Sequence, residues 1–581
     1  MRMIEAAADD AAAFVVFWCL FERGNLMKYA LIALGVVLFF MVEYRIELKR
    51  KEKQVRERDR NLWGHLSEKR YTKDQLQMIA SYHRGQVDGF GIDDITWNDL
   101  AMDEVFMKLN TTYSSVGEEY LYHTLRTPVF SQDELDKRSN LCDLFANDKK
   151  AREDVSFYLS CMGKNYRIPF TEYIVRLMDM TERSNVLHLV QFVLLAVSAV
   201  LTIAKPDYGL PMLLIMLLVN IASYYKEKGR VEPFFICIQR IAQLVDSSEK
   251  IIALHVAQMD AMTEEMAAVT RQIRHDLRGA GMIQSGGSMG GSLVDIILDY
   301  LRMITHIDLM AFNHIFRSLK LREKEVFHLI ELMGRLELAL ATASLREALP
   351  VWCKPELSGT KPKLNAEELY HPLINGAVPN SIATDRHVLL TGSNASGKST
   401  FLKTVAINAI LAQTLELTAA KSYRSSWFKV YSSMALSDNL FEGESYFIVE
   451  IKSLKRIMDK ISDSDYPVLC FVDEVLRGTN TVERIAASAQ ILKRFYGRSA
   501  LCFAATHDIE LTTLLAPYFD NYHFTEDVRE NDVCFPYQLK SGPATSRNAI
   551  RLLGVMGYEG DLTRKAEETA KRFLESGTWS L

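Results

Sequence analysis

An α/β domain that follows an all-helical region with transmembrane helices is the fold class that the sequence predicts. Three observations predict it. A glycine-rich loop near residue 390 lies between an apolar run and a helical stretch, and two later apolar runs end in acidic residues or histidine. Long uncharged runs occur in the first half of the chain. Short apolar runs are typical of buried strands, whereas runs near about twenty residues are typical of helices that cross a bilayer.

The composition fits a folded protein of several domains. The chain has 581 residues, of which 48% are hydrophobic, and a formal net charge of −5. A pI near 6.3 argues against a strongly basic nucleic-acid binder but leaves room for a local basic patch. The eight cysteines include no C-x-x-C pair. We therefore expect neither a disulfide framework nor a zinc site, and a reducing compartment is the simplest interpretation.

The glycine-rich loop has the phosphate-loop pattern G-x-x-x-x-G-K-[ST]. An apolar run at 387–390 precedes it and a helical stretch at 401–417 follows, which is the context the pattern requires and disfavours a chance glycine-rich turn. Its backbone N–H groups and the helix N-terminus are expected to bind the phosphates of ATP. Lys398 would neutralise the β- and γ-phosphates, and Ser399 would bind Mg²⁺. The predicted nucleotide-binding residues are Gly392, Ser393, Asn394, Ala395, Ser396, Gly397, Lys398, Ser399 and Thr400.

Two later apolar runs end in residues suited to phosphoryl transfer. The run 468–472 ends in Asp473, a second Mg²⁺ ligand, and in Glu474, the expected general base for the attacking water. An acidic pair after an apolar run is weak evidence alone but strong beside a phosphate loop. The run 500–505 is followed by His507, which would reach the γ-phosphate. The alternative for His507 is a core histidine. We expect Lys398, Glu474 and His507 to be catalytic.

Ser445 lies in the stretch DNLFEGESYFIVE, at the expected start of a helix. Small polar residues at a helix N-terminus can bind the γ-phosphate of a facing subunit, which would make the site dimeric. The alternative is an ordinary helix cap.

The apolar runs predict a multi-pass protein of the cell membrane with about three transmembrane helices. Residues 1–26 are an uncertain N-terminal extension, 27–44 form one span, and 185–225 form a hairpin. Basic residues after the first span place the ATPase domain in the cytoplasm. The alternatives are a DNA-binding basic run and two buried helices of a soluble core. The remaining regions are helical stretches at 45–183 and 226–349 and a nucleotide domain at 350–581.

Apolar residues at heptad-like spacing from Ile238 to Ile273 predict one long helix with a packing seam. His255 lies on that seam, so we expect a core or interface histidine rather than a ligand.

These motifs resemble those of the MutS family of DNA mismatch-repair ATPases. The resemblance is carried by the phosphate loop, by 438–450, by 473–481, by Ala505-Thr506-His507 and by the C-terminal stretch 540–553. It extends more weakly over 94–183 and from 336 onward, where 98–128 looks like the start of the family's helical core and 336–357 looks like its end. The resemblance implies an ABC-type ATPase of the MutS domain V kind, with Mg²⁺-dependent ATP hydrolysis, DNA binding, and a homodimer that the C-terminal stretch helps to form.

The sequence also departs from the family pattern. The stretch before Asp94 leaves no room for mismatch-recognition domains, so a truncated, membrane-anchored variant is expected. No Phe-x-Glu wedge occurs in a suitable place. Residues 377–380 lack the aromatic that the family often stacks on adenine. The predicted function is a dimeric, membrane-anchored ATP switch that binds DNA in mismatch repair. Two alternatives remain: a MutS-type ATPase that acts on a protein or lipid partner, and an ABC-type transport engine.

Overall fold

The structure is a computed structural model of the whole chain. It describes all residues except 1–25, 87–88, 167, 284–292, 394–395, 435–445, 463, 477–478, 529–532, 545–549, 551–552, 554–556 and 580–581. The chain divides into two units, residues 1–61 and 62–581. The second unit contains all the described sheets and the candidate site.

The described part of the first unit is the helix α2 (Leu26–Leu62). Its second half alternates acidic and basic residues, and Glu47–Lys51 and Glu52–Arg56 form ion pairs one turn apart at 2.7 and 2.9 Å. Such pairs stabilise an exposed helix by about 0.2–0.5 kcal/mol each. Residues 27–44, the expected first span, lie in this helix. The expected extension at 1–26 lies almost wholly outside the described residues.

Helices make up residues 62–349. Polar caps start several of them: Thr72, Asp93, Ser114 and Asp148 each accept from a backbone N–H in the first turn that follows. The helices are α3 (Lys73–Ile79), α4 (Ser81–Gly85), α5 (Asp94–Asp99), α6 (Met102–Leu109), α7 (Ser115–Arg126), α8 (Gln132–Asn147), α9 (Lys149–Met162), α10 (Phe170–Met178), α11 (Val186–Ala204), α12 (Pro206–Ile252), η1 (Ala257–Met259), α13 (Asp260–Asp276), η2 (Ala280–Met282), α14 (Leu293–Thr305), α15 (Ile307–Lys320) and α16 (Glu323–Ala348).

Strands appear after residue 350, and in the middle of this region, from residue 387 to 524, helices separate most of them, as the predicted α/β domain requires. The strands are β1 (Glu356–Leu357), β2 (Leu364–Leu369), β3 (Asn380–Thr384), β4 (His387–Thr391), β5 (Ser422–Ser425), β6 (Lys429–Ser433), β7 (Val468–Asp473), β8 (Ala500–Ala505), β9 (Phe519–Phe524), β10 (Asp527–Val528), β11 (Val533–Cys534) and β12 (Leu539–Ser541). The helices are α17 (Lys398–Thr414), α18 (Tyr446–Ser462), α19 (Thr481–Lys493), α20 (Glu510–Leu514) and α22 (Gly560–Ser576).

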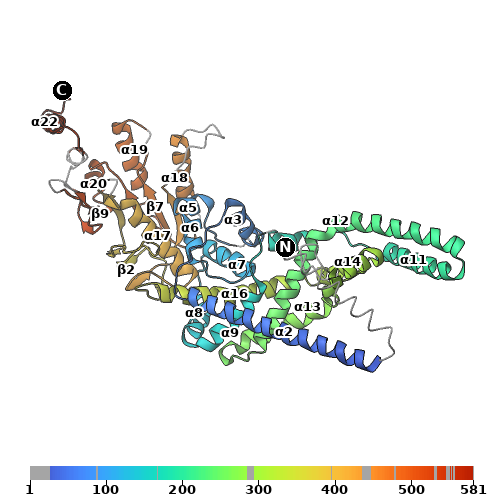
Figure 1. The fold of residues 1–581 in the computed structure, drawn as a ribbon. Coiled ribbons are helices and arrows are strands. Elements are labelled where there is room, and N and C mark those ends of the chain that lie inside the picture. The colour runs from blue at the N-terminus through green and yellow to red at the C-terminus, as the bar shows by residue number, and fades with distance from the viewer. Residues whose placement is uncertain are drawn as a thin grey trace. The chain divides into compact units, whose positions relative to one another are not determined.

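The main sheet has six strands in the order β12-β9-β4-β8-β7-β6, of which only β12 is antiparallel to its neighbour (Figure 1). Leu390 pairs with Ala505, and Ala505 pairs with Asp473. The carboxyl ends of β4, β8 and β7 therefore meet at one edge of the sheet. In open α/β sheets, ligands bind at this edge.

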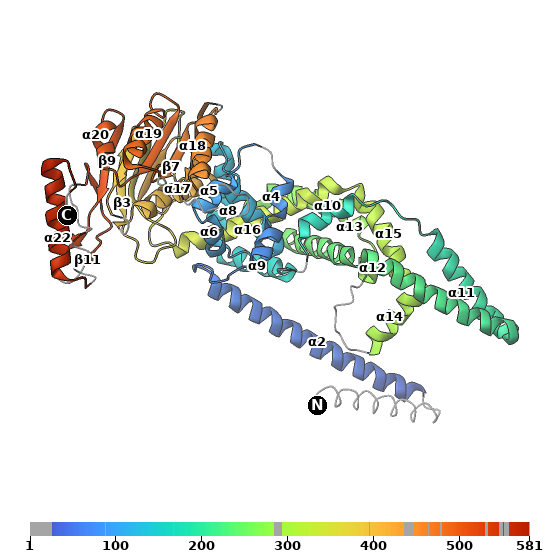
Figure 2. The same ribbon diagram turned by 90° about the horizontal axis from the view of Figure 1, so that it is seen from above.

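The two faces of the sheet are covered by different helices (Figure 2). Alternate side chains such as Leu390, Phe471 and Phe503 join the core on the side of α17. The intervening ones, such as Leu389 and Cys470, pack with residues of α18, α19 and α20. Both faces are buried, which explains why these strands are continuous apolar runs in the sequence.

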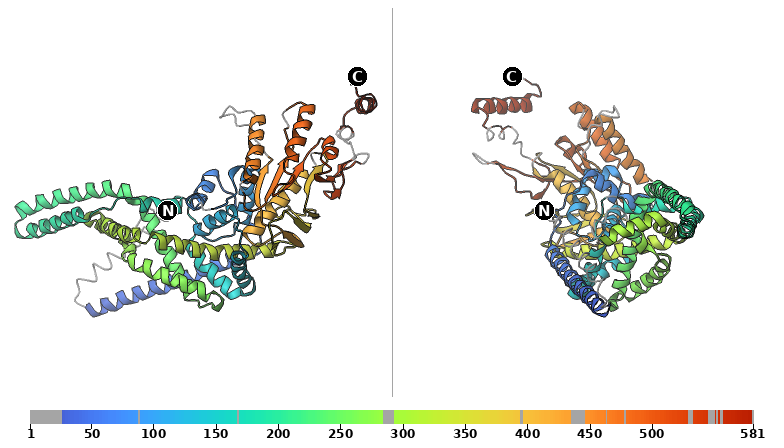
Figure 3. Two further views of the ribbon diagram at one scale, coloured as in Figure 1. Left: turned by 180° about the vertical axis from the view of Figure 1, so that it is seen from behind. Right: turned by 45° about the vertical axis from the view of Figure 1, so that its right-hand side comes forward.

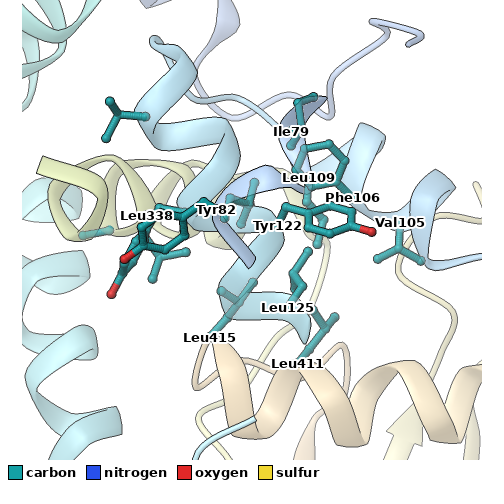
Figure 4. Packing of buried hydrophobic residues seen from close by; sticks show 14 of the residues in the cluster. Ile79, Tyr82, Val105, Phe106, Leu109, Tyr122, Leu125, Leu338, Leu411 and Leu415 are labelled. Carbon is teal, nitrogen blue, oxygen red and sulfur yellow. The ribbon is translucent and has the colours of Figure 1, made fainter. Parts of the chain in front are cut away.

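The core of the helical region continues into the C-terminal end of α17. Figure 4 shows Leu411 and Leu415 packed near Leu125 of α7, beside aromatic residues of the helical region. Polar contacts lie at the same junction. Arg138 donates to the Thr414 carbonyl at 2.8 Å, and the Val129 N–H donates to the Gln413 carbonyl at 2.9 Å. The helix whose first turn follows the phosphate loop is thus joined at its last turn to the helical region.

The helices α11 and α12 form a long antiparallel hairpin (Figure 3). Only Lys205 separates them, because Pro206 starts α12 at a position where a proline is favourable. The two helices pack closely near the turn: a Cβ at Gly209 would lie 2.2 Å from the Thr202 nitrogen. By length and composition, α11 and α12 are the two helices in the described part of the chain that could cross a membrane. Most side chains of 27–44 lie outside the described residues, so the third span that we expected there stays a prediction.

The expected single helix with a seam from Ile238 to Ile273 is wrong. α12 ends at Ile252, and α13 packs back against it from Asp260. His255 lies exposed at the reversal with φ +48°, not in a core. The periodicity was continuous because each of the two helices turns its own apolar stripe toward the other.

Candidate functional site

The phosphate loop connects β4 to α17 at the carboxyl edge of the main sheet. Gly392 has φ +141°, and a Cβ there would lie 2.7 Å from the Phe524 carbonyl oxygen. Gly397 has φ +104° and lies beside Tyr537, whose ring would be 3.1 Å from a Cβ at that position. Both positions therefore require glycine for backbone conformation and for space.

Lys398 is buried at the first turn of α17 and points back into the loop. Its Nζ donates to the carbonyl oxygens of Gly392 at 2.7 Å and Ser393 at 2.8 Å. The side chain is 2% exposed. A buried ammonium group needs such acceptors, because an unpaired charge in the interior is costly. Lys398 thus holds its charge within the loop, where phosphate oxygens could take over from the carbonyl groups.

Ser399 and Asp473 approach each other across the carboxyl edge of the sheet. The Ser399 hydroxyl donates to Asp473 Oδ2 at 2.5 Å. A hydroxyl and a carboxylate are hard oxygen donors, and Mg²⁺ binds proteins through one or two such groups while keeping several waters. The described residues contain no group of three or more His, Cys, Asp or Glu side chains arranged to hold a metal. The pair therefore fits Mg²⁺ better than a metal that needs a cage of protein ligands.

Glu474 and His507 form a close pair beside Lys398. His507 Nε2 lies 2.8 Å from Glu474 Oε1 and 3.5 Å from Lys398 Nζ. The shorter distance favours the tautomer in which His507 Nε2 donates to the Glu474 carboxylate. Glu474 has φ +56°, a left-handed conformation that costs a non-glycine residue on the order of 1–3 kcal/mol. Such strain clusters at functional sites.

Neighbouring hydrogen bonds hold the two strand ends in place. The Glu474 N–H donates to the Ala505 carbonyl at 2.9 Å, which joins the ends of β7 and β8. Glu450 of α18 accepts from the backbone N–H of Leu476. After His507, Asp508 accepts from both Nε and Nη2 of Arg484 at 2.9 and 2.6 Å. Planar bidentate pairs of this kind fix orientation as well as charge.

The structure brings together Lys398, Ser399, Asp473, Glu474 and His507, as the sequence predicted. Gly392, Ser393, Ser396 and Gly397 form the loop, and Thr400 lies exposed in the first turn of α17. Three predicted residues, Asn394, Ala395 and Ser445, lie outside the described residues. Their expected roles remain predictions.

Two residues at the site were not found by sequence reasoning. The Ser393 hydroxyl donates to Oε2 of the buried Glu526 at 2.5 Å. Tyr537 lies against Gly397 with its side chain half exposed, and its carbonyl accepts from the Asn380 side chain at 3.0 Å. Both come from the stretch between β9 and β12, whose short strands carry no motif. Their proximity to the loop was visible only in three dimensions.

Comparisons with known proteins agree with this geometry. A protein-family model described as MutS domain V matches residues 388–574. The DNA mismatch repair protein MutS of Pseudothermotoga lettingae is 29% identical over 270 residues, which are 44% of this chain and 32% of the relative. The corresponding protein of Desulfovibrio desulfuricans is 30% identical over 42% of this chain and 28% of the relative. That of Thermus aquaticus is 30% identical over 34% and 24%. The match thus spans about a third or less of each relative.

Proposed function

The chain is a MutS-family protein with a domain V of the P-loop ATPase type, and from this premise we propose that it binds ATP with Mg²⁺ and hydrolyses it. One observation carries the proposal. Lys398, the Ser399–Asp473 pair and the Glu474–His507 pair converge beside one phosphate loop at the carboxyl edge of one sheet. This set supplies phosphate binding, metal binding and a base, which are the parts that phosphoryl transfer to water needs.

Each residue has a separate task in hydrolysis. Lys398 would exchange its two carbonyl partners for phosphate oxygens and neutralise their charge. Bound through Ser399 and Asp473, Mg²⁺ would supply further neutralisation of the phosphates. Glu474 would accept a proton from the attacking water. His507 contacts the Glu474 carboxylate in this structure. It would turn to the γ-phosphate and thereby release the Glu474 carboxylate. Tyr537 offers a ring beside Gly397 on which the nucleotide base could stack.

The site is proposed to work in a homodimer. Ser445 of one subunit would complete the site built on Lys398 of the other, and ATP binding would close the dimer. Hydrolysis would reopen it. The junction of α17 with α7 and α8 supports a transfer of this motion to the helical region, because Arg138 and Val129 bind the last turn of α17 directly.

The α11–α12 hairpin is proposed to cross the cell membrane and to leave the ATPase domain in the cytoplasm. The buried residues of α11 are the polar His188, Gln191 and Ser198, whereas its apolar side chains face outward. Ile203 is 87% exposed. Its 19 residues span about 28 Å at about 1.5 Å per residue, close to the thickness of a hydrocarbon core. Apolar outside and polar inside is the arrangement expected in lipid.

The partner on which the ATP-driven motion acts is proposed to be DNA, in a role related to mismatch repair. The support is the name shared by the relatives, DNA mismatch repair protein MutS. A second candidate is a protein or lipid partner within the membrane. The hairpin favours it, because a membrane anchor restricts access to chromosomal DNA.

ATP hydrolysis by the detergent-solubilised full-length protein separates these proposals. The rate is measured without DNA and with homoduplex, mismatched or branched DNA. Stimulation of at least about threefold by one DNA form would support the first candidate. Hydrolysis that no DNA form alters would support the second. No hydrolysis with any DNA form, and none when the protein is returned to vesicles, would contradict the ATPase proposal itself.

A further inference from the structure

Four residues that follow the phosphate loop in the chain contact the loop or the end of β4 before it. We call these residues, Phe524, Glu526, Tyr537 and Ala544, the C-terminal strap. The Phe524 carbonyl lies under Gly392, and the Tyr537 ring lies beside Gly397. The Ala544 N–H donates to the Thr391 hydroxyl at 3.0 Å. Within the strap, Glu526 makes a side-chain hydrogen bond to the loop itself, through Ser393. Glu526 therefore differs from the other three, whose contacts are backbone or ring packing.

Glu526 is a buried carboxyl group with one defined task in this structure. Its side chain is 8% exposed, and its Oε2 accepts from the Ser393 hydroxyl at 2.5 Å. Such a short O–H···O distance is typical of a bond to an ionised carboxylate. Bonds to charged groups are stronger than bonds between neutral groups. This bond is therefore strong enough to fix the Ser393 side chain.

Ser393 is in turn the anchor of Lys398. The Ser393 carbonyl accepts from Lys398 Nζ at 2.8 Å and from the Ser396 hydroxyl at 2.7 Å. The Ser396 N–H also donates to it at 3.2 Å. Ser393 thus binds Glu526 of the strap through its side chain. Through its carbonyl it binds Lys398 and Ser396 of the second half of the loop. Moving Ser393 would move the ammonium group that is proposed to bind phosphate.

We propose that Glu526 is a positioning residue for the phosphate loop, acting through Ser393 on Lys398; the inference rests on the proposed ATP-binding function. A loop ordered before nucleotide arrives binds more tightly, because less conformational entropy is lost on binding. Glu526 itself contacts no phosphate in this account. Its removal should loosen the loop and weaken ATP binding while the Glu474–His507 pair and the turnover of bound ATP stay intact.

Two readouts test the inference on the full-length protein in detergent. Hydrogen exchange of the loop amides is measured on the nucleotide-free protein, and Kd, KM and kcat are measured with ATP. We expect Glu526→Ala to speed exchange of the loop amides, to raise the Kd and KM for ATP about tenfold and to leave kcat within about twofold. Ser393→Ala should do the same. The double variant should be no worse than either single one, because both remove the same bond.

Two controls separate positioning from general damage. Glu526→Gln keeps an oxygen that can accept from Ser393, so its Kd for ATP should stay within about threefold of the wild type. Asp520→Ala removes a carboxyl group of the preceding strand, β9, that is paired with Arg386 on the surface at 3.0 Å, and should change neither readout.

Several results would overturn the inference. Unchanged loop exchange in Glu526→Ala would do so, as would additive effects of Glu526→Ala and Ser393→Ala. Tighter ATP binding by Glu526→Ala would show that the carboxylate repels phosphate instead of ordering the loop. The exchange measurement needs no nucleotide. A wild-type protein that binds no ATP, but whose loop exchange responds to Glu526→Ala, would therefore contradict the proposed function and leave the positioning role standing.

Discussion

The sheet of the ATPase domain and the α11–α12 hairpin distribute polar and apolar side chains in opposite ways. In β7 and β8 the apolar side chains are fully buried, and the polar residues of the site lie where the strands end. In α11 the buried residues are polar, and the apolar ones lie on the surface. His188 of the hairpin, for example, pairs with His306 at 3.0 Å.

The proposed membrane hairpin explains this difference, because the two regions would then face different solvents. Apolar surface is removed from water in the sheet, which is the usual result of the hydrophobic effect. The same physics predicts the opposite arrangement where the surroundings are hydrocarbon, because polar groups must then find partners inside the protein. On the proposal made above, the sheet presents charge to water for chemistry, and the hairpin presents apolar surface to lipid.

Loss of nucleotide binding is expected from a change at the polar end of the sheet. Lys398→Ala should raise the Kd for ATP by at least about 100-fold, because two or more charge-assisted bonds to phosphate are lost. Titration with a fluorescent ATP analogue checks this. Lys403→Ala, on the same helix but away from the loop, should bind normally. Near-normal ATP binding by Lys398→Ala would show that Lys398 does not bind the phosphates.

Glu474→Ala tests the chemistry at the same edge without removing nucleotide binding. Loss of a general base should lower kcat by about 10²–10⁴-fold, with ATP still bound and the dimer trapped closed. Single-turnover hydrolysis and size-exclusion chromatography with ATP measure the two effects. Glu483→Ala, in the first turn of α19, is the matched control. Normal turnover by Glu474→Ala would refute its role as base.

The hairpin side of the comparison is tested by charging its outer face. Leu214 and Leu218 are 55% and 68% exposed, one helical turn apart. The double change Leu214→Lys and Leu218→Lys should oppose insertion by about 5–7 kcal/mol, from about 2.5–3.5 kcal/mol per lysine at a span centre. A thiol introduced as Tyr208→Cys at the turn should be protected from an impermeant reagent in inverted vesicles. It should become reactive in the charged variant.

Leu321→Lys is the control for that experiment, since this exposed leucine lies outside the hairpin. It should leave the Tyr208→Cys thiol protected. Reactivity of that thiol before any lysine is introduced would show that the hairpin lies in water. That result would contradict the proposed difference in surroundings between the hairpin and the sheet.

Tyr537 provides a smaller test at the site. Loss of a stacking ring should weaken ATP binding about fivefold or more, as expected for about 1–3 kcal/mol of base–aromatic stacking. Tyr537→Phe keeps the ring and should bind like the wild type, whereas Tyr537→Ala should not. Equal affinities of the two variants for ATP would place the base elsewhere.

The smallest effect concerns a buried polar group in the sheet. Burial lowers the pKa of His387 to about 4, and its Nδ1 accepts from the Cys502 N–H at 3.1 Å. The neutral form is favoured on folding, so stability is fully present above about pH 6.5 and falls as the pH drops toward 4. The loss is about 1.4 kcal/mol per pH unit in that window. Thermal unfolding at pH 7.5 and 5.0 should show this fall. His387→Gln should lessen it without abolishing it, because burial also lowers the pKa of His83, His123 and His371 to about 4.

The sequence predicted the sheet side of the comparison well. Apolar runs at 387–390, 468–472 and 500–505 became β4, β7 and β8, because strands buried on both faces leave a continuous signal. The motifs and the apolar runs beside them predicted that Lys398, Asp473 and Glu474 share one site. The structure brings them to one edge of the sheet, and their roles remain predictions. Tyr537 and Glu526 could not be predicted, because irregular segments bring them to the loop from a distance of more than 120 residues in the chain.

The sequence-based prediction failed where one apolar periodicity continued across a reversal of the chain direction. The apolar periodicity across His255 does not record the reversal between α12 and α13, since both helices carry an apolar stripe. The hairpin was visible as two uncharged runs, but only the structure shows that its buried residues are polar. Ser445 and the predicted dimer contact remain predictions.

The central claim, a membrane-anchored ATPase, is tested most directly by Mg²⁺-dependent ATP hydrolysis on the vesicle fraction after flotation and an alkaline carbonate wash. The account predicts that hydrolysis floats with the washed vesicles and is lost in Lys398→Ala. Hydrolysis that stays with the soluble fraction, or that survives Lys398→Ala, would contradict it.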